Sequence, residues 1–238
     1  MKLAVLLLAP ALLVAEECEQ STLLQKNLAA LKELKENGVD TKEGIPGFMA
    51  QMGLNMAVTT LQDAADAVDA EVKSSKKSLG KSLSGKFNVN ACTKDSNKKL
   101  SHVFSALQSE LEKGVKTVKA GLSTVGLSSS LTQLQDAMDT ATSLVKDMKS
   151  ACKLPVPPQD SDVAACQEAG ETGHTKLTNT FEEWISSAAN ELLTKVSSSD
   201  KASMRKYNKQ KVPETTKIVD DMGQGVQKLI DGIAKNLS

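Results

Sequence analysis

The 238-residue chain is long enough for one substantial core, because a domain of this size hides about 70% of its unfolded surface on folding. Its 29 basic residues balance its 29 acidic residues, and Arg205 is the only arginine, so neither net charge nor arginine contacts favour a nucleic-acid partner. Aromatic residues make up 3% of the chain, which argues against stacking platforms for bases or sugars.

The first fifteen residues, MKLAVLLLAPALLVA, predict a secretory signal peptide that is cleaved before Glu16. One lysine precedes a short apolar run, and the small residue Ala15 stands at the cleavage site. A membrane anchor is the alternative, but the run is shorter than the roughly 20 residues that span a bilayer, and Pro10 interrupts it. We expect a secreted, extracellular domain over 16–238, with no transmembrane anchor.

Apolar residues recur every three or four positions along most of the mature chain, which is typical of amphipathic helices. Six helices are expected, and their apolar stripes run through residues 24–31, 54–72, 104–122, 127–152, 177–196 and 219–237. Residues that favour helix ends are Asn37-Gly38, Pro46, Gly80, Asp95, Ser96, the Ser130/Gln133 capping-box pair, Pro155 and Pro213, the last near the first turn of the sixth helix.

The predicted fold class is all-α. Runs of β-branched residues that alternate with a period of two are missing, and short connections make successive helices antiparallel. We therefore expect an antiparallel bundle of about six amphipathic helices, arranged as three helical hairpins and stapled by disulfides at one end.

Two segments point to an internal repeat. LQDAADAVDAEVKSSK (61–76) and LQDAMDTATSLVKDMK (134–149) agree at 8 of 16 positions, and Cys18, Cys92 and Cys166 follow one another at intervals of 74. This spacing predicts three hairpin repeats over 18–91, 92–165 and 166–238. Chance similarity between two amphipathic helices rich in Ala and Asp is the alternative.

The four cysteines are expected to form disulfides, because a secreted chain folds in an oxidising compartment. Cys18, Cys92 and Cys166 each precede an odd-numbered helix, and Cys152 ends the fourth, so an up-and-down bundle places all four at one end. Of the three connectivities, we favour Cys18–Cys92 with Cys152–Cys166, since sequential hairpins should be neighbours. No two cysteines have the close spacing of a zinc site.

We find no sequence motif that indicates a particular enzymatic reaction. His102 lies on a predicted helix and His174 in a predicted glycine-bearing loop, and neither belongs to a nucleophile or metal motif. Asp63, Asp66 and Asp69 share a helix face, but a solvated polar surface explains them better than a cation site, because Ca²⁺ needs six to eight converging oxygens. We expect no catalytic residue, no metal and no cofactor.

Two groups of residues are candidates for ligand contact. Methionine adapts its shape to varied apolar guests, although it also fills irregular gaps in a core. The candidate apolar lining is Phe48, Met49, Met52, Met56, Met138, Met148 and Met222. A lysine-rich stretch can contact anionic headgroups or sulfated glycans, or can be a solvated connector. The candidate anion contacts are Lys73, Lys76, Lys77, Lys81 and Lys86.

The amphipathic hairpins resemble those of exchangeable apolipoproteins in general style, over most of the mature chain. No residue role follows from this resemblance. Together with the adaptable core it favours a secreted, non-enzymatic protein that binds or carries a lipid or small apolar ligand. The alternative is an extracellular interaction or structural protein that engages a protein partner through its helical faces.

Overall fold

The computed structural model describes residues 44–82, 88–124 and 126–237. These residues form the helices α2 (Gly47–Ser82), α3 (Val89–Thr124), α4 (Ser128–Ala151), α5 (Asp160–Lys195) and α6 (Lys201–Leu237), with no β-strand between them. The all-α prediction is therefore confirmed. Five helices stand where six were expected, because the predicted helix around 24–31 and the signal peptide lie outside the described ranges.

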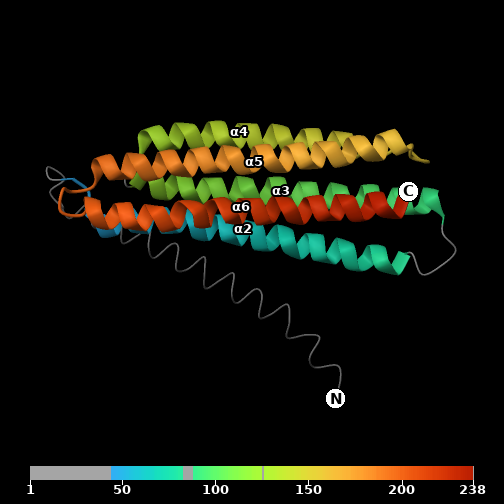
Figure 1. The fold of residues 1–238 in the computed structure, drawn as a ribbon, viewed down its shortest axis with the longest axis horizontal. Helices are drawn as coiled ribbons and strands as arrows, with labels where there is room; N and C mark the ends of the chain where they lie inside the picture. The colour runs from blue at the N-terminus through green and yellow to red at the C-terminus, as the bar shows by residue number, and fades with distance from the viewer. Residues whose placement is uncertain (1–43, 83–87, 125, 238) are drawn as a thin grey trace, which may run out of the picture.

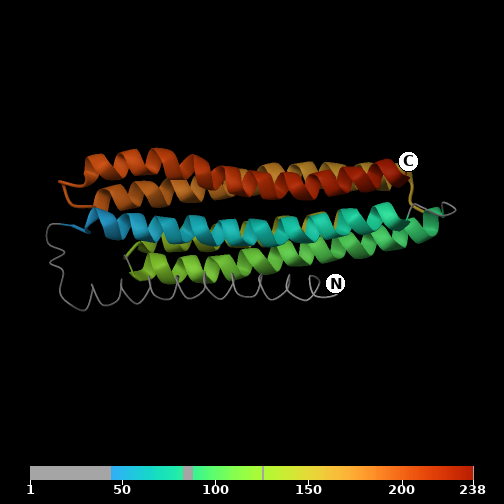
Figure 2. The same ribbon diagram turned by 90° about the horizontal axis from the view of Figure 1, so that it is seen from below.

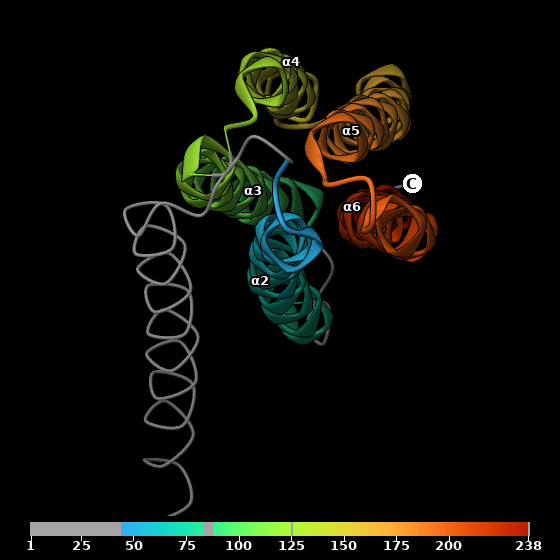
Figure 3. The same ribbon diagram turned by 90° about the vertical axis from the view of Figure 1, so that its left-hand side faces the viewer.

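The helices form an elongated bundle in which each runs antiparallel to the one before (Figures 1 and 2). An end-on view shows them around a common axis in the order α2, α3, α4, α5 and α6, and α6 packs against α2 to close the ring (Figure 3). We call the end with connections 125–127 and 196–200 the turn end. The opposite end, which carries connection 152–159 and the end of α6, is called the disulfide end.

The core follows the apolar stripes that the sequence predicts. On α4, for example, Leu134, Met138, Ala141 and Val145 are all buried, and the buried side chains of the five helices form one continuous cluster. Burying each large apolar side chain contributes about 1.5–3 kcal/mol, so this cluster is the main source of stability. None of the five helices has an apolar stretch long enough to cross a bilayer.

Helix limits differ from the prediction where another residue caps the helix, or where the expected cap makes a tertiary contact instead. The helix α3 begins at Val89, where the Asn88 side chain accepts a hydrogen bond from the Ala91 amide at 3.1 Å. The expected caps Asp95 and Ser96 therefore lie inside α3. Ser130 does not form a capping box either, because it lies inside α4 and donates to a carboxylate on α5.

The helices α5 and α6 begin earlier than expected. A capping box between Gln159 and Asp162 starts α5, so His174 lies within a continuous helix, and the loop predicted for it is wrong. The glycines of that segment permit close packing: a Cβ at Gly173 would lie 2.4 Å from Met148 Sδ. The helix α6 begins at Lys201, so Pro213 lies at an exposed position inside it and not in its first turn.

The two similar segments hold equivalent places in the bundle. Residues 61–76 of α2 and 134–149 of α4 have the same degree of burial at all 16 aligned positions. Gln62 donates to Asp66 at 2.8 Å, and the aligned Gln135 donates to Asp139 at 2.7 Å. The three-repeat organisation remains a prediction, because the first helix of the first repeat is outside the described residues.

A glycine closes the turn between α3 and α4. Gly126 has φ +73°, a left-handed backbone conformation that costs free energy for residues other than glycine. The Leu127 amide donates to Leu122 O at 3.0 Å and the Gly126 amide to Ser123 O at 3.2 Å, which is the Schellman pattern of helix termination. Leu122 and Leu127 are both buried, so this turn is anchored in the core.

Candidate functional site

Ser130 joins α4 to α5 at the turn end. Its amide donates to Glu191 Oε2 at 2.8 Å, its hydroxyl donates to the same oxygen, and its carbonyl accepts from Trp184 Nε1 at 3.2 Å. Lys195 Nζ lies 3.3 Å from Glu191 Oε1. Burial raises the pKa of Glu191, but the bonds from Ser130 and Lys195 outweigh it, and the net pKa is lowered. The contact therefore favours the ionised carboxylate.

Polar contacts also join α5 to α6. His174 Nε2 lies 2.8 Å from Asp220 Oδ1, and Asn208 Nδ2 donates to Ala189 O at 2.9 Å. A Cβ at Gly223 would lie 2.4 Å from His174 Cδ2, so the two backbones approach closely beside this pair. The three helices α4, α5 and α6 thus form a layer with internal hydrogen bonds, which we call the α4–α6 layer.

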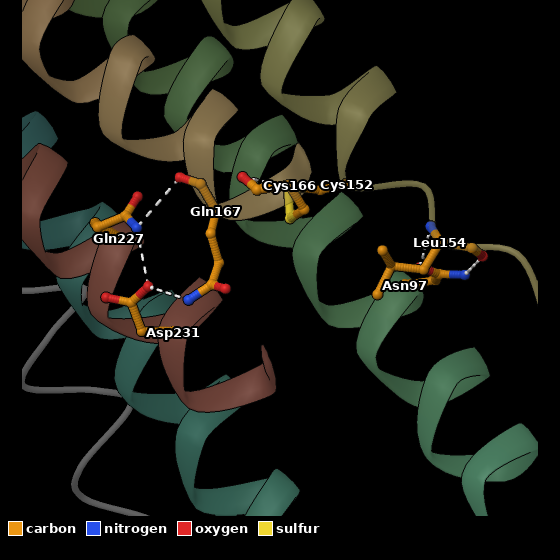
Figure 4. The surroundings of a disulfide bond; sticks show 7 residues. All are labelled: Asn97, Cys152, Leu154, Cys166, Gln167, Gln227 and Asp231. Atoms are coloured by element: carbon orange, nitrogen blue, oxygen red, sulfur yellow. Dashed lines mark hydrogen bonds between the residues drawn. A yellow bond between two sulfur atoms is a disulfide. The ribbon is translucent and has the colours of Figure 1, made fainter. Parts of the chain in front are cut away.

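A disulfide and an amide network hold this layer together at its other end (Figure 4). Cys152, which follows α4, is bonded to Cys166 in the second turn of α5, as the preferred pairing predicts. Asp231 Oδ1 accepts hydrogen bonds from Gln167 Nε2 and Gln227 Nε2, both at 3.0 Å. The disulfide therefore ties two consecutive helices, α4 and α5.

Cys92 lies at the same end, buried near the start of α3. It has no disulfide partner among the residues that the structure describes. Cys18 lies outside those residues, so the predicted Cys18–Cys92 bond remains a prediction.

The α2–α3 pair is attached to the layer at the turn end by backbone contacts. Ile45 donates to Lys195 O at 2.7 Å and accepts from the Ser197 amide at 3.1 Å. The Gly47 amide donates to Asp200 Oδ2 at 2.8 Å. The start of α2 is thus fixed beside the start of α6, close to the turn that joins α3 to α4.

At the disulfide end, one side chain attaches the pair to the layer. Asn97 Nδ2 donates to Leu154 O at 2.8 Å, and the Leu154 amide donates to Asn97 Oδ1 at 3.0 Å (Figure 4). Leu154 is buried, so both of its backbone groups depend on this amide. We call the Asn97–Leu154 pair the latch. Along the α3–α4 seam between the two ends, Lys119 contacts Gln135 and Lys149 contacts Ser105, and both contacts are solvent-exposed.

The candidate apolar lining is spread along the bundle and is not gathered in one cavity. Five of its residues are buried in the core, Met52 is partly buried, and Phe48 is 53% exposed at the start of α2. Met148 lies at the disulfide end, four residues before Cys152, whereas Met49 and Met56 lie in the first turns of α2. The buried members are Met49, Met56, Met138, Met148 and Met222.

Three of the predicted anion contacts are exposed near the disulfide end of α2. Lys73, Lys76 and Lys77 point to solvent, and a hydrogen bond from Lys73 to Asp69 raises the pKa of Lys73. The side chains of Lys81 and Lys86 are outside the described part of the chain. A role of the five lysines in anion contact remains a prediction.

The acidic face of α2 and the two histidines form no metal centre. Over the described ranges, no three His, Cys, Asp or Glu side chains converge as a metal site would require. Asp63 lies on the solvent-exposed side of α2, where partial desolvation by its neighbours and the charge of Asp66 raise the pKa of its carboxyl group. His102 is exposed on α3, whereas His174 pairs with Asp220 between α5 and α6.

The candidate functional site is therefore the seam between the α2–α3 pair and the α4–α6 layer. It is apolar inside, fixed by backbone contacts at the turn end, and fastened by the latch at the disulfide end. Comparisons with protein-family models, curated proteins and solved structures find no match to this chain.

Proposed function

We propose that this chain is a secreted, non-enzymatic bundle protein that binds a lipid or similar apolar ligand in the seam between the α2–α3 pair and the α4–α6 layer. The observation that carries the proposal is the uneven distribution of polar contacts. They join α5 to α6 along their lengths, and hydrogen bonds at one end together with the disulfide at the other join α4 to α5, whereas α2 and α3 are fastened to the layer by hydrogen bonds alone, mainly at the two ends.

This distribution lowers the free energy that is needed to separate the α2–α3 pair from the α4–α6 layer. Separating apolar faces exposes them to water at about 25 cal/mol per Å², but an apolar ligand tail restores that burial. Separating helices joined by buried hydrogen bonds also leaves polar groups unpaired, at about 1–3 kcal/mol each, and a lipid tail cannot compensate for that. The seam is thus the part of the bundle that a lipid can enter most easily.

Opening should start at the disulfide end. The turn end holds the chain connection between α3 and α4, the Ile45 backbone pairing and the Gly47–Asp200 contact. The disulfide end has the latch, whose two hydrogen bonds come from one side chain. Movement about the turn end would open the core near Met148, which packs against Gly173 of α5, and methionine suits a core that must repack around a guest.

The charge at that end favours a ligand with an anionic head. Lys73, Lys76 and Lys77 are exposed on α2 close to the expected opening. A tail in the seam would place its carboxylate or phosphate head near these lysines, and each such contact near a surface contributes about 1 kcal/mol. A long-chain fatty acid or an anionic phospholipid fits this arrangement.

The second candidate is an extracellular interaction or structural protein with a protein partner. In the described part of the surface, Phe48 and Val156 are the large apolar side chains that are exposed, at 53% and 41%. They lie at opposite ends of the bundle and form no continuous docking patch, so we rank this function second. Measuring the size of the protein in solution distinguishes a self-associating protein from a monomeric carrier.

The test is a titration of the full chain with a fluorescent long-chain fatty acid. The wild type should bind it saturably, and Asn97→Ala should bind it about tenfold more tightly, because a closed state destabilised by about 1.4 kcal/mol opens ten times more often. The matched control is Asn179→Ala, which changes an exposed asparagine on α5. Absence of saturable binding, or equal affinities of both variants, would contradict the proposal.

A further inference from the structure

An open groove lies between α4 and α5, within the α4–α6 layer and apart from the seam. Its volume is about 310 Å³, at the lower end of the roughly 300–1,000 Å³ typical of small-molecule sites. The lining residues are Gln133, Asp136, Ala137, Thr140, Thr180, Glu183, Trp184 and Ser187. Each helix thus contributes residues from two successive turns.

Small side chains produce the groove. Ala137 and Thr140 on α4 face Thr180 and Ser187 on α5, where larger residues would fill the space between the helices. The Ser130–Glu191 contact on one side and the disulfide at the far end fix the position of the two helices relative to each other. The groove is therefore built by fixed helices and does not depend on opening of the seam.

Trp184 forms an apolar wall whose orientation is fixed. Its side chain is 3% exposed, its Nε1–H donates to Ser130 O at 3.2 Å, and Phe181 packs edge-on with ring centroids 6.2 Å apart. Because the only donor of the indole is already used, the small part of the side chain that lines the groove offers carbon atoms and not a hydrogen-bond donor to an occupant. Tryptophan is the aromatic ring that attracts cations most strongly.

The charge of the groove is negative and uncompensated. Asp136 on α4 and Glu183 on α5 are both exposed, and no ion pair or hydrogen bond is found for either one within the described structure. The lining contains no lysine, arginine or histidine. Two carboxylates, one from each helix, therefore line the same groove as Trp184, and the lining supplies no positive charge.

We propose that this groove binds a small organic cation, an amine or ammonium compound with a compact apolar body. The ammonium group would lie between Asp136 and Glu183, the apolar body against Trp184, and the hydroxyls of Thr140 and Thr180 would accept remaining N–H donors. A bare metal ion fits less well, because the space is larger than one ion and supplies only two carboxylates.

Trp184 also supplies the readout, because it is the only tryptophan of the chain. Phenethylamine should change its fluorescence saturably, whereas 2-phenylethanol, which has the same ring and no positive charge, should not. Equilibrium dialysis with labelled phenethylamine measures the same binding if the fluorescence does not respond. Equal binding of the alcohol and the amine, or no saturable binding in dialysis, would overturn the proposal.

Neutralising substitutions locate the site. The double variant Asp136→Asn/Glu183→Gln should bind phenethylamine at least tenfold more weakly. The matched control is Asp139→Asn/Glu182→Gln, which removes two exposed charges on the same helices outside the groove, and its affinity should stay within twofold of the wild type. Circular dichroism checks that both variants are folded. An equal loss in the two double variants would show general attraction only and would overturn the assignment.

Discussion

Glu191 concentrates the polar contacts between α4 and α5, since it accepts two hydrogen bonds from Ser130 and lies beside Lys195. Replacing it by alanine leaves the Ser130 amide without its partner. We expect Glu191→Ala to lower the free energy of unfolding at pH 7 by about 1–3 kcal/mol, with a Tm decrease of about 2–4 °C per kcal/mol. Thermal unfolding followed by circular dichroism measures this, and Glu182→Ala on the exposed face of α5 is the control.

The pKa of Glu191 predicts how this loss depends on pH. Because its pKa is lower in the folded than in the unfolded state, the carboxylate stabilises the fold fully above its ordinary value of 4.5. The stabilisation is lost as the pH falls through the lower, folded-state pKa. The Tm difference between wild type and Glu191→Ala should therefore be constant near neutral pH and shrink below about pH 4.5. A difference that grows on acidification would contradict the assigned contacts.

The buried hydroxyl group of Ser96 is expected to lower the free energy of unfolding. It is fully buried in α3, and its hydroxyl has no hydrogen-bond partner in the described structure. Ser96→Ala removes an unpaired buried hydroxyl, so the free energy of unfolding should rise by about 1 kcal/mol. Ser109→Ala, at an exposed position of the same helix, should change Tm much less. A lower Tm for Ser96→Ala would show that the hydroxyl is paired in solution.

At the scale of helices, the contact between α5 and α6 requires a glycine at one position and not at another. A Cβ at Gly223 would lie 2.4 Å from His174 Cδ2, whereas a Cβ at Gly225 meets nothing within 4 Å. Gly223→Ala should therefore cost about 1–3 kcal/mol of stability, and Gly225→Ala should add about 0.5–1 kcal/mol through helix propensity. Chemical denaturation of both variants measures the two values. Equal effects would contradict the close approach of α5 and α6.

The apolar stripes were predictable because a helix in a bundle must bury one face, and the four-three spacing along α4 predicts most of that face, although Ser130 and Ala137 are buried as well. Helix limits were less predictable, because α3 and α5 begin at other local caps than expected, Asn88 and the Gln159–Asp162 box, and because one expected cap has a distant partner. The sequence pattern predicts Ser130 as a helix cap, but its amide donates a hydrogen bond to Glu191, which is 61 positions further along the chain. His174 looked like part of a loop because glycines surround it, yet those glycines permit close helix packing.

Some features of the candidate sites can be predicted from a sequence pattern, and others cannot. Gly126, placed between two apolar stripes, matches the pattern of a helix C-terminus, so the turn that anchors the seam was readable from the sequence. The groove was not, because Asp136 and Glu183 line the same groove only through the register of two antiparallel helices. The latch was hidden for the same reason, since Asn97 and Leu154 are 57 positions apart.

At the scale of the whole molecule, the bundle consists of two parts that are fastened in different ways. The α4–α6 layer is tied by a disulfide and by hydrogen bonds between its helices, and it carries the groove. The α2–α3 pair is fastened to it at the ends and packs on it through the core. The layer should therefore stay intact while the pair moves, so binding in the groove and binding in the seam are separable by the variants described above.

The movement of α3 relative to α5 tests the central claim most directly. Genetically encoded spin labels, which leave the cysteines unchanged, would be placed at Lys98 and Glu168 near the disulfide end, and in a second sample at Lys116 and Asn190 near the turn end. All four positions are exposed. On addition of a long-chain fatty acid, we predict that the Lys98–Glu168 distance distribution lengthens while the Lys116–Asn190 distribution does not. Bound fatty acid with both distributions unchanged would contradict opening of the seam.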